Sequence, residues 1–283
     1  MKVLRGSRFR RLFRGVYVAA EVTVAAEIQA GAALALHPAD AFASHQTAAA
    51  LRGLPVAACD RAHVTVMRQE QRVQRYGVAC HVACRETRVE QVKGMRVSAP
   101  LDMFIELAGV LSLVDLVIVG DAMVRAGLFT VLELQKFCAG TSRWHARRAR
   151  RGAAYVRDGV DSPMETRLRM LLVLAGLPEP KVNHKIVDAN GWVLRRLDLS
   201  YPAIKVIVEY NGRQHADDPE QYSTDIERRE EFDDEEWRLI VVVSDAIFKD
   251  PGHTIMRVAR ALRRRGMRLG PLSDAWRAHF PIG

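Results

Sequence analysis

Cysteine is scarce in this sequence, and the few cysteines present lack the spacing of a structural framework. The 283 residues hold four of them, too few and too irregularly placed for the disulfides that staple small secreted domains. Cys80 and Cys84 flank His81, but the paired close ligands of a zinc site are missing around them. We therefore expect ordinary reduced thiols rather than a metal site.

Long apolar runs and low-complexity tracts are missing as well. Glu21 and Glu27 interrupt the Ala/Val-rich stretch near the N-terminus, which leaves neither a secretory apolar core nor a membrane-spanning run of about 20 residues. The sequence therefore predicts a cytoplasmic protein without a membrane segment.

The residues that are abundant indicate a folded protein with a polyanionic partner. Apolar residues make up 49% and charged residues 27%, which is typical of globular domains, and 283 residues suffice for two of them. The formal net charge of +9 favours nucleic acid as the partner.

Residues 1–140 are predicted to form an α+β domain. The first fifteen residues carry six basic side chains and no acid, and they lead into a β-prone run, which predicts a basic strand or hairpin at the surface. Ala-rich helices, short alternating strands and further helices follow. The expected helices span 20–36, 44–53, 100–108, 114–125 and 131–138, and the expected strands span 63–67, 78–82 and 95–97.

Residues 141–160 are predicted to form an arginine-rich helix that leads into a second domain. Five arginines fall within nine residues, and helical spacing brings Arg143, Arg147 and Arg150 onto one face. Such a face is either simply solvated or in contact with phosphates.

The second domain is expected at 161–268, with a C-terminal tail at 269–283. Ser162 can cap a helix that begins at Pro163, and Glu165 completes a capping box. Alternation and turn residues then predict strands at 182–187, 192–199, 204–210 and 238–243, with helices at 218–236 and 253–265.

Two carboxylates of this domain point to a chemical function. Asp198 stands near the end of the second strand and Glu209 near the end of the third, and antiparallel pairing through the short turn between them would set the two side by side. Carboxylate oxygens suit Mg²⁺, whose remaining positions go to water and phosphate. The pair therefore predicts a Mg²⁺ or Mn²⁺ site for phosphodiester hydrolysis.

Other polar residues near this pair each have two interpretations. Glu165 is either explained by the capping box alone or is a third acid of the site. His215, in the loop after the third strand, either handles a proton or phosphate or is an ordinary surface residue. Asp225 and Arg228 have the spacing of an ordinary ion pair on a helix surface.

The second domain resembles the PD-(D/E)XK nuclease superfamily in the order of its elements, which is a helix, three strands, a helix and a strand. It also has acids on the first helix and on the second and third strands, as that superfamily does. Several motifs, in order, are similar to those of a domain of unknown function in actinobacterial proteins related to very short patch repair (Vsr) endonucleases. These motifs are the segments 162–165, 196–199 and 208–215, followed by Asp225 and Arg228. The resemblance implies an α/β restriction-endonuclease-like fold with the core order αβββαβ, and a Mg²⁺-dependent DNA endonuclease. The residues it implies for the site are Glu165, Asp198, Glu209, Asn211 and His215, with Arg213 on the nucleic acid.

The first domain resembles the AbiEi-like antitoxin region. There a winged helix-turn-helix ends in a basic wing of the form Arg-x-x-x-Arg-Gly-Val-Tyr, to which residues 10–17 are similar. The resemblance implies DNA contacts from this wing and a partner protein from a toxin–antitoxin or defence system. Because the chain begins almost at the wing, we expect no recognition helix for reading bases. The arginines of the wing region are Arg8, Arg10, Arg11 and Arg14.

Two departures from the nuclease pattern favour a non-catalytic alternative. Asn211 stands where the superfamily has lysine and the closer relatives tend to have aspartate, and an amide supplies no charge. Residues 227–236 hold seven acids against two arginines, a face that repels DNA and leaves arginines such as those of 257–265 to meet it. The alternative is a DNA-binding or AbiEi-like antitoxin or regulatory protein that keeps a nuclease fold. A purely protein-binding module would leave the basic excess unused.

Overall fold

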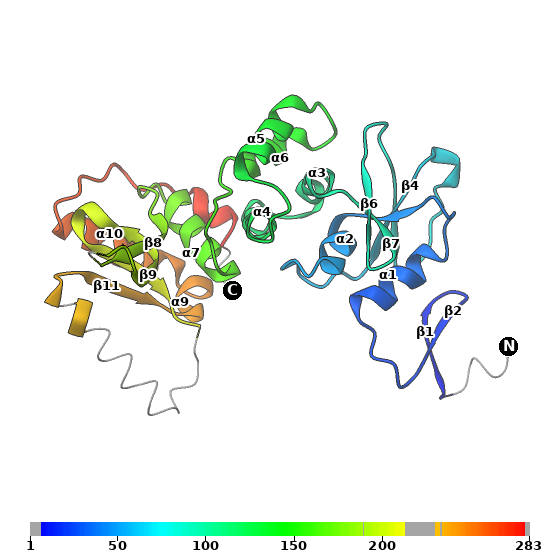
Figure 1. The fold of residues 1–283 in the computed structure, drawn as a ribbon, viewed down its shortest axis with the longest axis horizontal. Coiled ribbons are helices and arrows are strands. Elements are labelled where there is room, and N and C mark those ends of the chain that lie inside the picture. Colours follow the sequence, from blue (N-terminus) through cyan, green and yellow to red (C-terminus); the bar gives the residue numbers. More distant parts are fainter. Residues whose placement is uncertain (1–6, 189, 213–229, 233, 281–283) are drawn as a thin grey trace. The chain divides into compact units, whose positions relative to one another are not determined.

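The chain is a mixed α/β protein that divides into two compact units, Met1–Ala154 and Tyr155–Gly283. The computed structural model describes residues 7–188, 190–212, 230–232 and 234–280. Each unit has a sheet and an apolar core of its own (Figure 1). Within the described ranges, no helix is both long and apolar enough to cross a membrane.

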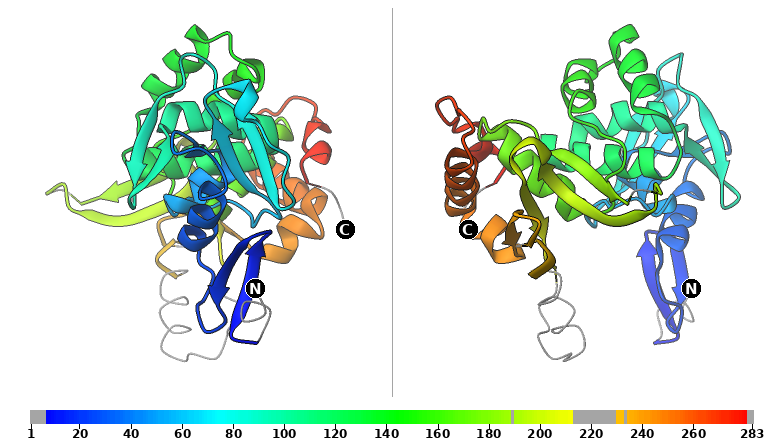
Figure 2. Two further views of the ribbon diagram at one scale, coloured as in Figure 1. Left: turned by 90° about the vertical axis from the view of Figure 1, so that its right-hand side faces the viewer. Right: turned by 60° about the vertical axis from the view of Figure 1, so that its left-hand side comes forward.

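Unit 1, Met1–Ala154, contains near its N-terminus a hairpin of β1 (Phe9–Phe13) and β2 (Val16–Ala19), which lies beside α1 (Ala26–Leu34) (Figure 2). The strands pair antiparallel around a tight turn in which Gly15 has a φ of +88°, a value that other residues rarely adopt. Phe13 is buried in the apolar core of unit 1, whereas the hairpin arginines are exposed. The predicted basic surface hairpin is confirmed.

A mixed sheet forms the centre of unit 1, with the strand order β5–β4–β3–β7–β6. The middle strand, β3, pairs antiparallel with β4 and parallel with β7. The sequence does not predict β3, which has only two residues, or β6, which lacks period-two alternation. The strands are β3 (Phe42–Ala43), β4 (Ala62–Val66), β5 (Val78–Val82), β6 (Val89–Val92) and β7 (Met95–Ser98).

Helices pack on this sheet and on one another. The small residues of the arginine-rich helix α6 let it approach its neighbours closely: Ala149 is fully buried, and a Cβ on Gly152 would lie 2.6 Å from Cδ2 of Leu116. This helix, at the end of unit 1, packs on three other helices of that unit, and the unit ends at Ala154, within the segment 141–160 predicted as a connecting helix. The helices are α2 (His45–Leu51), α3 (Pro100–Val110), α4 (Leu113–Arg125), α5 (Val131–Gly140) and α6 (Ala146–Ala153).

Unit 2, Tyr155–Gly283, is built on a four-stranded sheet in the order β11–β10–β9–β8. The first three strands along the chain form an antiparallel meander, and the fourth runs parallel to the third. Residues 230–232 and 234 are helical, and 213–229, with most of the helix predicted at 218–236, lie outside the described residues. The elements are α7 (Pro163–Leu174), β8 (Lys181–Val187), β9 (Val193–Tyr201), β10 (Val206–Tyr210), β11 (Arg238–Val242), α9 (Ser244–Phe248) and α10 (Pro251–Arg264).

The C-terminal segment is part of the core of unit 2. Trp276 and Phe280 are each 4% exposed, and a short 3₁₀ turn, Ala275–Ala278, packs on α7. The backbone N–H of Ser273 also donates to the carbonyl of Ala175, at 2.9 Å. As far as residue 280, the segment predicted as a tail is therefore an integral part of the unit.

Candidate functional site

The turn between β9 and β10 brings Asp198 and Glu209 to neighbouring positions. The antiparallel register of the two strands runs as far as Val208 opposite Leu199, so the two acids come one step beyond this pair. The backbone N–H of Tyr210 donates to Oδ2 of Asp198 at 3.3 Å, which ties this carboxylate to the end of β10. Glu209 is 8% exposed. The predicted antiparallel pairing of the two strands is confirmed.

Glu165 lies in the first turn of α7, and its carboxylate is buried. Ser162 Oγ accepts a hydrogen bond of 3.2 Å from the Glu165 backbone N–H, and Glu165 Oε2 accepts one of 3.1 Å from the backbone N–H of Asp161. Burial raises the pKa of Glu165, and so does the nearby charge of Asp198, while hydrogen bonding of its carboxylate to the Ser162 side chain and to the Asp161 backbone N–H acts in the opposite direction. Glu165 therefore supports the helix start and also lies within electrostatic reach of Asp198.

Asn211 directly follows β10. Its backbone N–H donates to the carbonyl of Val242 at 2.8 Å, which extends the parallel pairing with β11 beyond Glu209. Asn211 thus stands at the same end of the sheet as Glu209. Four other residues singled out by the sequence analysis lie outside the described residues: Arg213, His215, Asp225 and Arg228.

The donors that this end of the sheet offers to a cation are carboxylate oxygens. Such hard ligands suit Mg²⁺ or Mn²⁺ better than they suit softer metals. The three acids, all within the described ranges, do not form a group whose oxygens all lie within 4.8 Å of one another.

The acidic stretch that precedes β11 is partly neutralised by neighbouring basic side chains. Arg195 on β9 forms ion pairs with Glu231, at 2.5 Å, and with Glu235, at 3.1 Å. Lys205, in the turn between β9 and β10, pairs with Glu236 at 3.6 Å. The repulsion of DNA expected from the sequence is reduced accordingly.

A cleft of about 310 Å³ between α10 and the edge strand β11 is lined by five arginines. Two of them are oriented by the backbone: Arg257 donates to the carbonyl of Val241 at 3.2 Å, and Arg265 to that of Glu236 at 2.8 Å. Guanidinium groups gathered in this way suit phosphate oxygens. The five are Arg238, Arg257, Arg260, Arg264 and Arg265.

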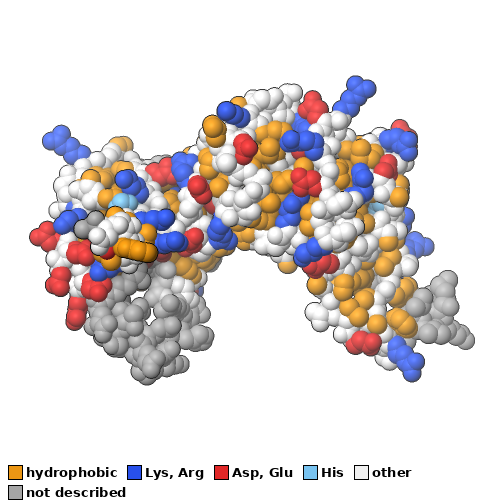
Figure 3. Space-filling view, viewed as in Figure 1, with side chains coloured by type: hydrophobic (Ala, Val, Ile, Leu, Met, Phe, Trp, Pro, Cys, Tyr) orange, Lys and Arg blue, Asp and Glu red, His pale blue; other side chains and the backbone are white. Residues whose placement is uncertain are grey.

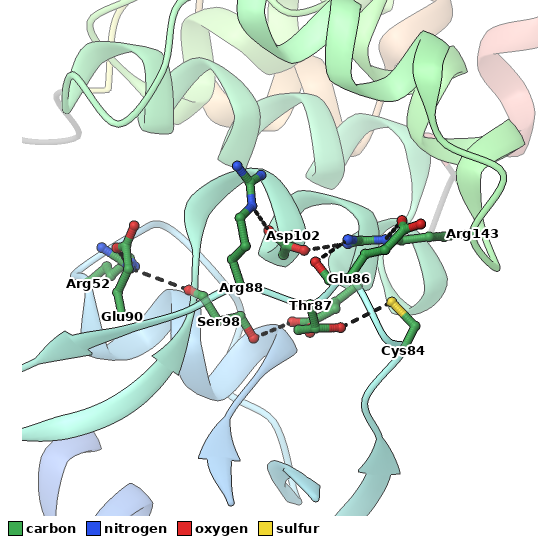
Figure 4. Close-up of polar contacts among 10 residues, drawn as sticks. Arg52, Cys84, Glu86, Thr87, Arg88, Glu90, Ser98, Asp102 and Arg143 are labelled. Atoms are coloured by element: carbon green, nitrogen blue, oxygen red, sulfur yellow. Dashed lines mark hydrogen bonds and ion pairs between the residues drawn. The ribbon is translucent and has the colours of Figure 1, made fainter. Parts of the chain in front are cut away.

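Two of the three arginines predicted to contact DNA from the α6 region have structural partners. Arg143 forms an ion pair with Asp102, a carboxylate that is 1% exposed and also bound by Arg88 at 3.0 Å (Figure 4). Arg150 donates to two backbone carbonyls, at 3.0 and 3.3 Å. Arg147 is exposed. Arg143 therefore has a clear structural role, the neutralisation of a buried acid.

The hairpin arginines form an exposed basic surface in unit 1. The side chains at 8, 10, 11 and 14 are all exposed, and Arg10 donates to the carbonyl of Val22 at 2.9 Å. On the face drawn in Figure 3, basic and acidic side chains are interspersed over both units. The positive excess is thus not gathered into one patch on that face.

Comparisons with known proteins give relatives without a stated activity. No family model matches the chain, and no solved structure matches it significantly. Two uncharacterized proteins, from two strains of Mycobacterium tuberculosis, are each 26% identical to it over 187 residues, which is 64% of this chain. The match covers 66% of each relative, so the chain spans just under two thirds of the length of these curated relatives.

A cluster of three side chains that could hold a metal ion lies in unit 1. One ring nitrogen each of His45, His63 and His81 comes within 4.8 Å of the others, and this is the one group of three or more such side chains found among the described residues. The sequence associates His81 only with Cys80 and Cys84, and it gives no motif that joins the three histidines.

Proposed function

We propose that unit 2 is a metal-dependent DNA endonuclease of the Vsr-like class, in which Asp198 and Glu209 hold Mg²⁺ or Mn²⁺. The observation that carries the proposal is the register of β9 and β10, in which these two acids come one step beyond the last pair, Val208 opposite Leu199, with Glu165 in electrostatic reach of Asp198. A restriction-endonuclease-like fold is part of the proposal. It is supported by a helix, an antiparallel meander of three strands, helical residues and a fourth strand parallel to the third, in that order.

Each residue has a role that follows from its surroundings. Asp198 accepts a hydrogen bond from the Tyr210 N–H, which holds this carboxylate before a ligand arrives, and Glu209 comes from a buried strand. The raised pKa of Glu165 makes it a better acceptor for the proton of an attacking water than an ordinary glutamate. Asn211 can orient water or phosphate, and His215 would handle a proton or phosphate. A bound cation would supply positive charge at the phosphate and lower the pKa of that water.

The DNA backbone would be held by arginines. The cleft between α10 and β11 supplies five of them in the unit that carries the acids. The hairpin arginines and Arg147 add exposed positive charge in unit 1. Binding through phosphates would weaken steeply as salt rises. The proposed setting is the cytoplasm.

The test is nicking of supercoiled plasmid by the full chain with Mg²⁺ or Mn²⁺. We expect wild type to nick, and Asp198→Ala and Glu209→Ala to lose at least about 100-fold in rate, because each removes a ligand of the cation. Asp245→Ala is the matched control, since this exposed acid pairs with Lys249 one helical turn away and should nick as wild type does. Equal nicking by all four proteins would assign the activity to another site.

The alternative function is DNA binding without cleavage, as in an antitoxin-like regulator. Asn211 favours it, because the position lacks the charge that nucleases of this type carry. Under this alternative, wild type binds duplex DNA in a salt-dependent way, does not nick it, and takes up no Mg²⁺. Replacement of Arg260 and Arg264 with alanine weakens DNA binding under either function, so it serves as the positive control for the binding assay.

A further inference from the structure

Three histidines from separate elements of unit 1 face one another. His45 is the first residue of α2, His63 lies in β4 and His81 in β5. Nδ1 of His63 and Nε2 of His81 are 3.0 Å apart, and the ring of His45 stacks on that of His81 with the centroids 3.9 Å apart. We propose that this three-histidine cluster binds a divalent transition metal of the zinc class, with the remaining coordination position left to water or a small ligand.

The spacing of the nitrogens fits one tetrahedral ion. Zinc binds imidazole nitrogen at about 2.0–2.1 Å, so two such ligands on one ion are about 3.3 Å apart. The separation of 3.0 Å between Nδ1 of His63 and Nε2 of His81 is close to that value, and one ring nitrogen from each of the three histidines lies within 4.8 Å of the others. The three rings are stacked with interplanar angles of 7–28°, so binding one ion requires them to rotate until their lone pairs converge on it.

In two of the rings, the nitrogen that would not bind the ion already lies near a hydrogen-bonding side chain. A metal-bound histidine nearly always uses its other ring nitrogen in a hydrogen bond, which fixes the ring. Nδ1 of His45 lies 3.0 Å from Oγ of the fully buried Ser44, and Nε2 of His63 lies 3.5 Å from Sγ of Cys59. This leaves Nε2 of His45 and Nδ1 of His63 for the ion.

Burial keeps the rings in the protonation state that a metal requires. His45 and His63 are 8% and 6% exposed. Burial and the neighbouring histidines lower the pKa of both, that of His63 to about 4, and burial also lowers the pKa of His81. All three are therefore neutral at pH 7. Imidazoles without a carboxylate select zinc, copper or nickel over magnesium.

The backbone and the surroundings of His45 give two further observations. Its φ of +50° lies in the left-handed region, which residues other than glycine adopt rarely and which often occurs at functional sites. A cavity of about 360 Å³ is lined by His45 and His81 together with Glu106, Arg143 and Cys84, among others. The cavity gives an ion and a small ligand a way to the cluster. Because the cluster lies in unit 1, the inference does not depend on the nuclease proposed for unit 2.

The test is metal uptake by the full chain, carried out in the Asp198→Ala/Glu209→Ala background so that these two acids of unit 2 cannot contribute. Protein stripped with EDTA and dialysed is titrated with Co²⁺, followed by visible absorption, and then with Zn²⁺ in competition. We expect one ion per chain. His45→Gln, His63→Gln and His81→Gln should each weaken binding by at least about 100-fold. His253→Gln, an exposed histidine of unit 2, is the control and should bind as the background protein does.

X-ray absorption of the Zn²⁺-loaded background protein keeps the test decisive where a histidine variant does not fold. We expect three imidazole nitrogens at about 2.0 Å and no sulfur. Binding that persists in all three histidine variants overturns the proposal. So does a sulfur-containing shell, or no uptake of Co²⁺ or Zn²⁺ at micromolar concentrations.

Discussion

The backbone N–H of Tyr210 donates a hydrogen bond of 3.3 Å to the carboxylate of Asp198, and so joins the ends of β10 and β9. An asparagine oxygen can still accept this bond, whereas an alanine cannot. We expect Asp198→Asn to keep the free energy of unfolding within about 0.5 kcal/mol of wild type, and Asp198→Ala to lose about 1 kcal/mol. Both should lose nicking, because neither offers a charged ligand. Urea unfolding and plasmid nicking measure the two effects, and wild-type nicking by Asp198→Asn would remove Asp198 from the metal site.

Glu179 stabilises unit 2 by neutralising a buried arginine. The side chain of Arg169 is 0% exposed and donates to Glu179 Oε1 at 3.2 Å. Glu179→Ala should lower the free energy of unfolding by about 3 kcal/mol, because it removes a carboxylate that is hydrogen-bonded to a buried guanidinium. The exposed pair of Asp245 with Lys249 is the control, and Asp245→Ala should change stability by less than about 0.5 kcal/mol. Similar losses in the two variants, measured by urea unfolding, would contradict this account.

Cys138 should be the least reactive thiol of the folded protein. It is 1% exposed, and burial raises its pKa to about 11, against the opposing effect of Arg150. Relative to a thiol of pKa 9, its thiolate fraction at pH 8 is about 100-fold lower. Cys84 is exposed and should react first. Timed alkylation followed by peptide mass spectrometry checks the order, and early labelling of Cys138 would show that this part of unit 1 opens readily.

Removal of metal should destabilise unit 1. An ion present at 100 times its Kd adds about 2.7 kcal/mol to the free energy of unfolding of the state that binds it. For a unit of this size we expect Zn²⁺ to raise the Tm by several degrees and EDTA to reverse the change. Differential scanning calorimetry of wild type and His63→Gln measures this. An equal rise in His63→Gln would mean that Zn²⁺ acts elsewhere.

Local patterns explain why so much of unit 2 could be predicted from the sequence. Ser162 and Pro163 mark the start of α7, and Ser162 Oγ does cap that helix. The Asp198–Glu209 neighbourhood also depends on a short turn, because two strands joined by a few residues pair antiparallel. The register then follows from the length of the turn.

What the sequence could not give depends on contacts between distant segments. His45, His63 and His81 meet only because α2 packs on β4 and β4 pairs parallel with β5, and neither contact has a sequence signature. The roles of the charged residues were equally hidden. Arg143 is used to neutralise Asp102, and Arg195 neutralises part of the acidic stretch, although composition alone predicts solvated or DNA-binding surfaces.

The proposal for unit 2 requires that Asp198 and Glu209 share one divalent cation. Titration calorimetry of Mg²⁺, and separately of Mn²⁺, into the full chain with duplex DNA present measures this directly. We predict one ion per chain for wild type, and loss of that binding in the Asp198→Asn/Glu209→Gln double variant. No uptake by wild type, or the same uptake by the double variant, would contradict metal-dependent cleavage at this pair of acids.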